Sequence, residues 1–326
     1  MNILVTGAAG YLGSTLIPLL LSQGHSVVAL DGLIHGAAGR PLLGVWANPR
    51  FRFVRADIRD KAAVTAALKG VDAVIHLAAI VGDPACARNP TDSKAINLDA
   101  TLRLAEAAEA AGVKRFVFAS TCSNYGKMPD AAKLLDEDSE LKPVSLYAET
   151  KVAVEKALLD KSRFRGMSTT ALRLSTLFGV SPRMRFDLTV NEFVLKLITE
   201  QHLVVFGEQF WRPYVHVHDA ARAFALVLSR TAAEVDHEVF NVGADDLNYT
   251  KGGLLKLMAP VAPKARIERV QKTEDPRDYR VGFTKIRTRL GYVPEHSLES
   301  GVQEIARLVD PGVLPDLAAA EFTNTP

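Results

Sequence analysis

Short apolar runs and longer amphipathic segments alternate along the first half of the chain. The apolar runs predict buried β-strands at 2–6, 26–30, 51–55, 71–77, 114–119 and 168–174. Helical periodicity lies between several of them, at about 11–23, 96–111 and 145–159. Because strands and helices alternate through short links, the pattern predicts an α/β fold with a Rossmann-type, doubly wound parallel sheet. Ligands of such a sheet bind at the carboxyl ends of its strands.

The regular alternation of strand and helix patterns ends after Ser175. An irregular basic loop at 181–187 is followed by helical patterns at 190–200, 219–230, 249–258 and 298–308 and by short apolar runs at 203–206, 214–217, 238–242 and 267–271. We predict three parts: a Rossmann domain over 1–175 with a returning segment at about 215–242, a smaller mixed C-terminal substrate-binding lobe over 176–214 and 243–310, and a weakly ordered tail at 311–326.

Three glycines mark the turn between the first strand and the first helix, in the sequence TGAAGYLG. Gly7 permits a tight turn, Gly10 lets backbone N–H groups approach a pyrophosphate at the positive helix end, and Gly13 lets the helix lie close to the sheet. Asp31 ends the second strand, where a carboxylate accepts hydrogen bonds from an adenosine ribose and repels a 2′-phosphate. No Arg or Lys follows before Arg40, so the segment predicts NAD rather than NADP as the cofactor.

Two further strand ends carry residues suited to a cofactor. Asp57, after the third strand, can accept a hydrogen bond from the adenine amino group, and Ile58 can pack on the ring. An N-cap for the helix that begins near Asp60 is an equally good interpretation of Asp57. After the fourth strand, Ala78 and Ala79 are small enough for the chain to pass close to a ligand.

Tyr147 and Lys151 are four residues apart on a predicted helix and therefore share one face. A neighbouring ammonium group and the positive nicotinamide of NAD both lower the pKa of a phenol, whose usual value is about 10. Tyr147 can then act as a general base on a sugar hydroxyl, and Lys151 can also hold the nicotinamide ribose. Hydroxyls that follow the fifth strand, in Ser120 and Thr121, can position the reacting oxygen. A solvated helix face and a polar turn are the alternatives for these two motifs.

Composition narrows the class of protein further. The chain has 326 residues, 48% of them hydrophobic, and a net charge of +2, so nothing favours a nucleic-acid partner. Cys86 and Cys122 are too few for a disulfide framework and indicate a reducing cytoplasm. The apolar start is too short for a signal peptide, and no run reaches the ~18 apolar residues of a membrane span, so no membrane partner is expected.

Several motifs occur in a fixed order: TGAAGYLG, ADI, HLAA, STCSNYG, YAETK, ALRLSTLFG, WRPYVHVHD and FNVG. From residue 1 to about residue 300 the chain resembles the extended short-chain dehydrogenase/reductase family of NAD-dependent nucleotide-sugar epimerases and dehydratases, and within it the sugar 4-epimerases. The resemblance implies NAD as cofactor, a nucleoside-diphosphate sugar as substrate, and catalysis by Thr121, Tyr147 and Lys151. It also implies a homodimer formed through the helices at 97–111 and 145–159.

The same resemblance completes the set of candidate site residues. The predicted cofactor-binding residues are Gly7, Gly10, Tyr11, Leu12, Gly13, Asp31, Gly32, Asp57, Ile58, Leu77, Ala78, Ala79, Asn97, Ser120, Tyr147 and Lys151. The predicted substrate-binding residues are Thr121, Ser123, Thr176, Asn191, Arg212 and Arg277. Arginine suits a diphosphate because its guanidinium forks onto phosphate oxygens, and Arg212 is the strongest candidate because it adjoins the strand motif. The loop 183–187 and the segment 275–280 are expected to decide which sugar and nucleotide bind.

Departures from the family pattern narrow the predicted reaction. Family 4,6-dehydratases carry Asp-Glu directly after the catalytic Thr, and the decarboxylases carry Glu at the second position, but here Cys122 and Ser123 stand there. Family 3,5-epimerases carry a catalytic Cys at the Ser123 position, so we interpret Cys122 as a packed thiol. We therefore predict a 4-epimerase that works through a transient 4-keto sugar. A 4-dehydrogenase or 4-keto reductase stays an alternative, and the intact triad disfavours a non-catalytic NAD-binding regulator.

His216 and His218 share one face of a predicted strand and precede Asp219, a pattern that can bind a metal ion. The family motif YVHVxD accounts structurally for the first of these histidines, and the redox chemistry of NAD requires no metal. We therefore predict no metal site.

Overall fold

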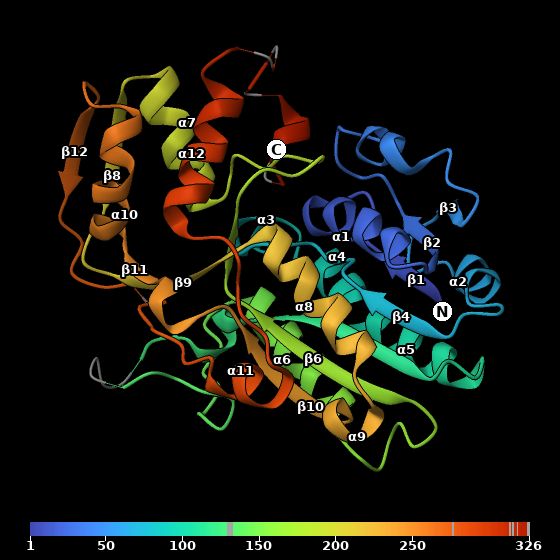
Figure 1. Cartoon of the computed structure of the whole chain (residues 1–326). Coiled ribbons are helices and arrows are strands. Elements are labelled where there is room, and N and C mark those ends of the chain that lie inside the picture. The colour runs from blue at the N-terminus through green and yellow to red at the C-terminus, as the bar shows by residue number, and fades with distance from the viewer. Residues whose placement is uncertain (129–132, 276, 313, 315, 318, 325–326) are drawn as a thin grey trace.

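The computed structural model of the chain describes every residue except 129–132, 276, 313, 315, 318 and 325–326. Within this part the centre is a seven-stranded parallel sheet, in the order β10-β6-β5-β4-β1-β2-β3 (Figure 1). Its strands are β1 (Asn2–Thr6), β2 (Ser26–Asp31), β3 (Phe51–Arg55), β4 (Ala73–His76), β5 (Arg115–Thr121), β6 (Ser168–Leu174) and β10 (Glu238–Val242). The predicted Rossmann-type, doubly wound sheet is confirmed.

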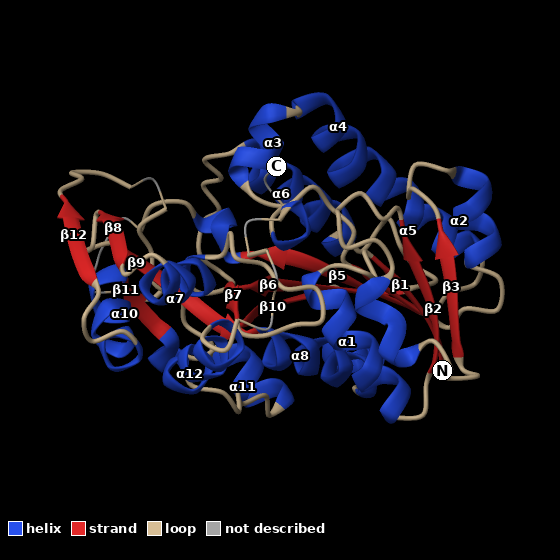
Figure 2. Ribbon diagram, turned by 90° about the horizontal axis from the view of Figure 1, so that it is seen from above, coloured by secondary structure: helices blue, strands red, loops and turns tan. Residues whose placement is uncertain are grey.

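Helices cover both faces of the sheet (Figure 2). One layer contains α1 (Tyr11–Ser22) and α8 (Val217–Ser229), and the other contains α2 (Lys61–Ala67), α5 (Thr101–Ala110) and α6 (Leu146–Leu159). Alternate residues of β1 pack against the two helix layers. Ile3 and Val5 belong to the hydrophobic cluster of the first layer, and Leu4 belongs to that of the second. Burial on both faces explains why the strands are almost continuously apolar in sequence.

The C-terminal half adds a smaller mixed lobe on the side of the sheet away from β3 (Figure 1). Its strands are β7 (Thr176–Phe178), β8 (His202–Phe206), β9 (Trp211–His216), β11 (Asn248–Thr250) and β12 (Arg266–Val270), and its helices are α7 (Thr189–Thr199), α10 (Lys251–Met258) and α12 (Leu298–Val309). β9 pairs in parallel with β7 and antiparallel with β11, and β8 pairs in parallel with β12. No helix in the described part of the chain is long and apolar enough to cross a membrane.

The sequence pattern does not predict several helices. α3 (Asp83–Arg88) and α4 (Pro90–Lys94) occupy a segment whose prolines and Asn89 are typical of loops. Each proline stands in the first turn of its helix, where a missing N–H group costs no helical hydrogen bond. The short helices α9 (Ala232–Val235) and α11 (Thr284–Leu290) are likewise unpredicted.

Candidate active site

A cavity of about 730 Å³ opens at the carboxyl ends of β1, β2, β4 and β5. The predicted site residues that line it are Gly7, Gly10, Tyr11, Leu12, Gly13, Asp31, Gly32, Asp57, Ile58, Leu77, Ala78, Ala79, Ser120, Thr121, Ser123, Tyr147, Lys151, Thr176 and Arg277. One cavity therefore unites the predicted cofactor site with the predicted catalytic residues. Three predicted residues lie outside its wall, namely Asn97, Asn191 and Arg212.

The glycine turn leaves no room for side chains. Gly7 has a φ of +70°, and a Cβ atom there would lie 2.6 Å from the backbone N of Ala78, just beyond β4. A Cβ atom at Gly13 would lie 2.4 Å from the carbonyl O of Gly7. Gly10 is the N-cap of α1 and supplies no side-chain hydrogen bond to the first turn of this helix. The N–H groups and the positive dipole of that turn fit the pyrophosphate of a dinucleotide.

Asp31 is fixed by the backbone at the end of β2. Its Oδ2 accepts a hydrogen bond from the backbone N of Ala9 at 2.9 Å, and its Oδ1 accepts one from the backbone N of Leu33 at 2.7 Å. Burial raises the pKa of this carboxyl, and the two hydrogen bonds oppose the rise. The carboxylate therefore has one orientation on the cavity wall beside the glycine turn, which suits the predicted contact with an adenosine ribose.

Asp57 is not the N-cap of the following helix, although the sequence allows that interpretation. α2 is capped by Asp60, whose side chain accepts hydrogen bonds from the backbone N atoms of the first turn. The Asp57 carboxylate instead binds Arg59, at 2.8 Å from its Nη2, and this hydrogen bonding lowers the pKa of Asp57. Asp57 and the adjacent Ile58 both line the cavity, so the predicted adenine contact stays a prediction that the geometry permits.

Tyr147 and Lys151 lie on adjacent turns of α6 and face the same cavity. The helix begins directly after Ser145, whose hydroxyl caps its first turn. Lys151 Nζ donates a hydrogen bond to the carbonyl O of Ala119 at 2.8 Å, which ties the helix to β5. The same Nζ lies 5.8 Å from the centroid of the Tyr147 ring.

Burial shifts the pKa values of both Tyr147 and Lys151 so as to disfavour their charged forms. It lowers the pKa of Lys151 to about 7, because the charged ammonium loses its hydration. It raises the pKa of Tyr147, because the phenolate loses its hydration too. The sequence predicts that Lys151 lowers the pKa of Tyr147, but in the chain by itself desolvation has the larger effect. A phenolate at neutral pH therefore requires a further positive charge in the cavity.

Thr121 ends β5 with its hydroxyl on the cavity wall. Its Oγ1 accepts a hydrogen bond from the backbone N of Ser123 at 3.1 Å, which leaves the hydroxyl proton able to point to a ligand oxygen. Ser123 also lines the cavity, and its Oγ lies 3.5 Å from the Tyr279 hydroxyl. The Ser120 hydroxyl is turned the other way and donates to Glu155 Oε2 at 2.7 Å.

A buried polar network supports the strand that carries these hydroxyls. Glu155 on α6 forms an ion pair with Arg173 on β6, and both side chains are almost completely buried. Asn124 Nδ2 donates to Ser120 Oγ at 3.0 Å. Cys122 is buried, its Sγ donates to the carbonyl O of Arg173 at 3.2 Å, and burial raises the pKa of its thiol. Cys122 is therefore a packed thiol, as predicted.

Asn97 and Asn191 lie behind the cavity wall. The Asn97 side chain binds both backbone groups of Ile80, accepting from its N at 2.8 Å and donating to its O at 2.9 Å, and Ile80 lines the cavity. Asn191 accepts from the backbone N of Gly179 at 3.1 Å and donates to the carbonyl O of Arg185 at 2.8 Å. Both amides position wall segments, and neither lines the cavity itself.

Arg212, the strongest predicted diphosphate ligand, is not brought to the cavity. Its Nη2 is paired with Asp275 Oδ2 at 2.8 Å, and both side chains are largely buried. Arg277 lines the cavity instead, and its Nη1 donates a hydrogen bond at 2.9 Å to Oδ2 of Asp83, which is the first residue of α3. Of the two arginines predicted to bind substrate, Arg277 therefore lines the cavity and Arg212 does not.

The structure also adds residues that the sequence analysis does not name individually. They are His35, Arg183, Arg185, Asp187, Tyr279 and Asn324, all on the cavity wall. The loop 183–187 is expected to influence the choice of substrate, and its basic character is the signal for three of them. Tyr279 belongs to the segment 275–280, of which Pro276 lies outside the described residues. Nothing in the sequence points to Asn324, because its contacts arise only when the end of the chain folds back.

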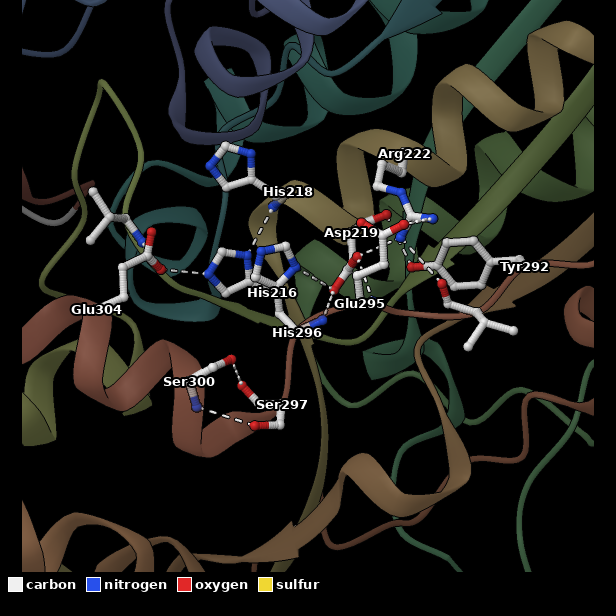
Figure 3. Close-up of polar contacts among 12 residues, drawn as sticks. His216, His218, Asp219, Arg222, Tyr292, Glu295, His296, Ser297, Ser300 and Glu304 are labelled. Carbon is white, nitrogen blue, oxygen red and sulfur yellow. Dashed lines mark hydrogen bonds and ion pairs between the residues drawn. The ribbon is translucent and has the colours of Figure 1, made fainter.

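The histidines of the YVHVHD segment form a separate cluster (Figure 3). The rings of His216 and His296 stack with centroids 4.1 Å apart, and His218 stacks beside them. Glu304 binds His216 Nε2 at 2.7 Å, and Asp219 binds His296 Nδ1 at 3.0 Å. The cluster joins α8 to α12 and lies outside the cavity wall. Within the described residues, no group of three or more His, Cys, Asp or Glu side chains is arranged to hold a metal ion.

A parallel Rossmann sheet, a glycine turn that fits a pyrophosphate and a Tyr–Lys helix on one cavity define the class of dinucleotide-dependent short-chain enzymes. The chain matches the model of the NAD dependent epimerase/dehydratase family over residues 3–243, and it belongs to that family. The family resemblance given by the sequence motifs is thereby confirmed, together with NAD as the family cofactor.

Relatives match nearly the whole length of the chain. The UDP-glucose 4-epimerase of Mycolicibacterium smegmatis is 32% identical over 308 residues, covering 93% of this chain and 96% of the relative. The dTDP-glucose 4,6-dehydratase of an Actinoplanes species is 32% identical over 320 residues, covering 93% and 96%. The crystal structure of UDP-glucuronic acid 4-epimerase from Bacillus cereus, in complex with UDP-glucuronic acid and NAD, superposes with a TM-score of 0.82 at 26% identity, covering 95% and 99%. Both 4-epimerases and dehydratases are thus similar to this chain.

The lowered pKa of Lys151 predicts a pH-dependent stability. Its folded-state pKa of about 7 lies below the value of 10.5 expected when the chain is unfolded, so between these values the unfolded state binds more protons. Stability contributed by this residue therefore increases as pH rises, by about 2 kcal/mol from pH 7 to pH 9. We expect urea unfolding of Lys151→Met to show a higher free energy of unfolding than the wild type at pH 7, and a smaller gap at pH 9. An equal difference in the free energy of unfolding between the variant and the wild type at both pH values would contradict the lowered pKa of Lys151.

Proposed function

We propose that this protein is a nucleotide-sugar 4-epimerase that works through a transient 4-keto sugar. The observation that carries the proposal is the position of Thr121, Tyr147 and Lys151 on the cavity that also contains the glycine turn, with no carboxylate in the two residues after Thr121. Elimination of water requires an acid and a base next to the sugar. Cys122 is buried away from the cavity and Ser123 is a neutral hydroxyl, so the triad favours oxidation and reduction at one carbon.

Each member of the triad has a distinct part in the proposed reaction. Tyr147 removes the proton from the sugar 4-hydroxyl, and later returns it, as general base and acid. Thr121 donates its free hydroxyl proton to the same oxygen and so fixes the reacting carbon. Lys151 supplies positive charge beside the phenol and is held by Ala119. Bound NAD supplies the hydride acceptor and donor that the chain itself lacks.

Proton NMR in heavy water tests this function directly. The purified protein is incubated with UDP-, GDP-, ADP-, CDP- and dTDP-sugars, without added cofactor. We expect one of them to yield its C4 epimer with no deuterium incorporated at carbon, because the hydride is retained within the site. Deuterium at C3 or C5, or a 4-keto-6-deoxy product, would refute the 4-epimerase proposal. Turnover that occurs only with added NAD and accumulates NADH would identify the 4-dehydrogenase alternative.

Loss of the proposed base is expected to separate chemistry from binding. Tyr147→Phe removes only the phenol oxygen, so kcat should fall by about 10²–10⁴-fold while the NAD content of the purified protein stays unchanged. Thr121→Ala should also lower kcat, and Thr121→Ser, which keeps the hydroxyl, should restore most of it. Full activity in Tyr147→Phe would exclude the proposed mechanism.

Arg277 is the proposed ligand of the substrate diphosphate, and the Asp83 carboxylate competes with the diphosphate for the Arg277 guanidinium. Arg277→Gln should raise KM for the nucleotide sugar about tenfold, because a charged hydrogen bond is lost. Asp83→Asn should lower KM, because the guanidinium becomes free and a like charge near the diphosphate is removed. Arg163→Gln, which breaks an exposed pair with Glu106, is the matched control. A KM that responds to Arg212→Gln but not to Arg277→Gln would reverse the assignment.

We also propose that the enzyme is a cytoplasmic homodimer. Two long helices on one face of the sheet, α5 and α6, are the proposed contact surface, as the family resemblance implies. Two buried free cysteines suit a reducing compartment.

A further inference from the structure

Four guanidinium groups line the cavity, and three of them have carboxylate partners. Arg59 pairs with Asp57 and Asp92, Arg185 pairs with Asp187, and Arg277 pairs with Asp83. Arg183 differs, because in the described part of the chain no carboxylate lies within the 4.0 Å of an ion pair. Its side chain binds neutral groups only, with Nη1 donating to Asn324 Oδ1 and Nη2 donating to the carbonyl O of Thr323 at 3.1 Å.

Arg183 is also the most deeply buried of these four arginines, with an exposed fraction of 2%. Its Nε is buried and has no hydrogen-bond partner among the described residues. Burial and the nearby Arg185 lower its pKa to about 10. A buried cation without an opposite charge is unfavourable unless a ligand supplies that charge. The wall of the cavity therefore contains one unbalanced positive charge.

The position of this charge indicates which anion balances it. The backbone N of Arg183 donates to Ser14 Oγ at 3.3 Å, which places the residue against the first turns of α1. The guanidinium also acts on Asp31 at the end of β2, where it opposes the rise in pKa that burial causes, and it adds to the effect of burial in lowering the pKa of His35 to about 4. Arg183 thus lies between the helix end that fits a pyrophosphate and the carboxylate that suits the adenosine ribose.

We propose that Arg183 binds the pyrophosphate of NAD, from the side opposite the glycine turn, and that the C-terminal residues hold it there. This inference rests on the cofactor site described above and does not depend on which sugar reacts. The glycine turn offers only N–H groups and a partial helix charge, so a full guanidinium charge completes the balance of a doubly negative pyrophosphate. A 2′-phosphate is the less suitable anion, because Asp31 would repel it.

The end of the chain forms a strap over this part of the cavity, which we define as residues 321–324. Glu321 pairs with Arg40 in the loop after β2, and the carbonyl O of Phe322 accepts from the backbone N of Phe186 at 2.8 Å. The backbone N of Asn324 donates to Asp187 Oδ2 at 3.0 Å. The strap therefore joins the adenosine side of the cavity to the basic loop. An enzyme that regenerates its cofactor in every turnover benefits from such closure.

Nucleotide binding to the full-length protein, freed of bound nucleotide and without any sugar substrate, tests the proposal. Calorimetric titrations with NAD, ADP and adenosine separate phosphate from nucleoside contacts, and a further titration with NADP tests for a 2′-phosphate site. Arg183→Gln should weaken NAD and ADP by about tenfold to a hundredfold, leave adenosine unchanged and reduce the salt dependence of NAD binding. Arg163→Gln is the matched control and should leave all three affinities unchanged.

Other outcomes would overturn the proposal. Equal weakening of adenosine and ADP would mean that Arg183 only supports the fold of the site. Weakening confined to NADP would assign the guanidinium to a 2′-phosphate instead. Asn324→Ala keeps the guanidinium and alters only the strap, so it should accelerate NAD release severalfold, and unchanged release would refute the role of the strap. Because these are binding measurements, they stand or fall separately from the search for C4 epimers.

Discussion

The close approach of the backbone at Gly7 is the constraint on which the whole site depends. A side chain at Gly7 would collide with the chain beyond β4, and one at Gly13 would collide with the carbonyl of Gly7. Because neither glycine carries a side chain, α1 begins close to the carboxyl end of β1, and Asp31 is fixed beside it. The helix α6, which carries Tyr147, is then fixed to the sheet by the hydrogen bond from Lys151 to Ala119 near the end of β5. Both halves of the cavity thus follow from backbone geometry at the strand ends.

Charge balance is the second organising principle, and it links distant parts of the chain. Arg277 and Asp83 come from distant parts of the sequence, and so do Arg40 and Glu321. Such pairs add to an apolar cluster that the two parts share, which contains Tyr11 of the nucleotide-binding half and Val194 of the lobe and has Phe322 of the tail packed against it. Exposed pairs contribute little to stability, about 0–1 kcal/mol each. The pair of Arg277 and Asp83 matters for position, because it holds the Arg277 guanidinium on the cavity wall.

Local patterns predicted the fold and the inner part of the site, and long-range pairing explains the rest. Gly7, Asp31, Tyr147 and Lys151 could be assigned from the sequence because each belongs to a motif whose spacing fixes its place on a strand end or a helix face. The sequence could not show that Arg277 lines the cavity and Arg212 does not, because both arginines have carboxylate partners and only the fold decides where each pair lies. Asp275 neutralises Arg212 inside the lobe, and residue spacing does not reveal such pairs.

The balance at Tyr147 connects the two halves of the cavity energetically. Burial raises the pKa of this phenol more than the nearby groups of the chain lower it, and burial also lowers the pKa of the Lys151 ammonium. A general base of this kind therefore depends on an additional positive charge close to the ring, and an oxidised nicotinamide carries one. Ionisation of the base is in this way coupled to occupancy of the cofactor site. In the proposed mechanism, loss of the cofactor would therefore leave Tyr147 protonated, and contacts that retain the cofactor at the adenosine end would support proton transfer at the other end without touching the sugar.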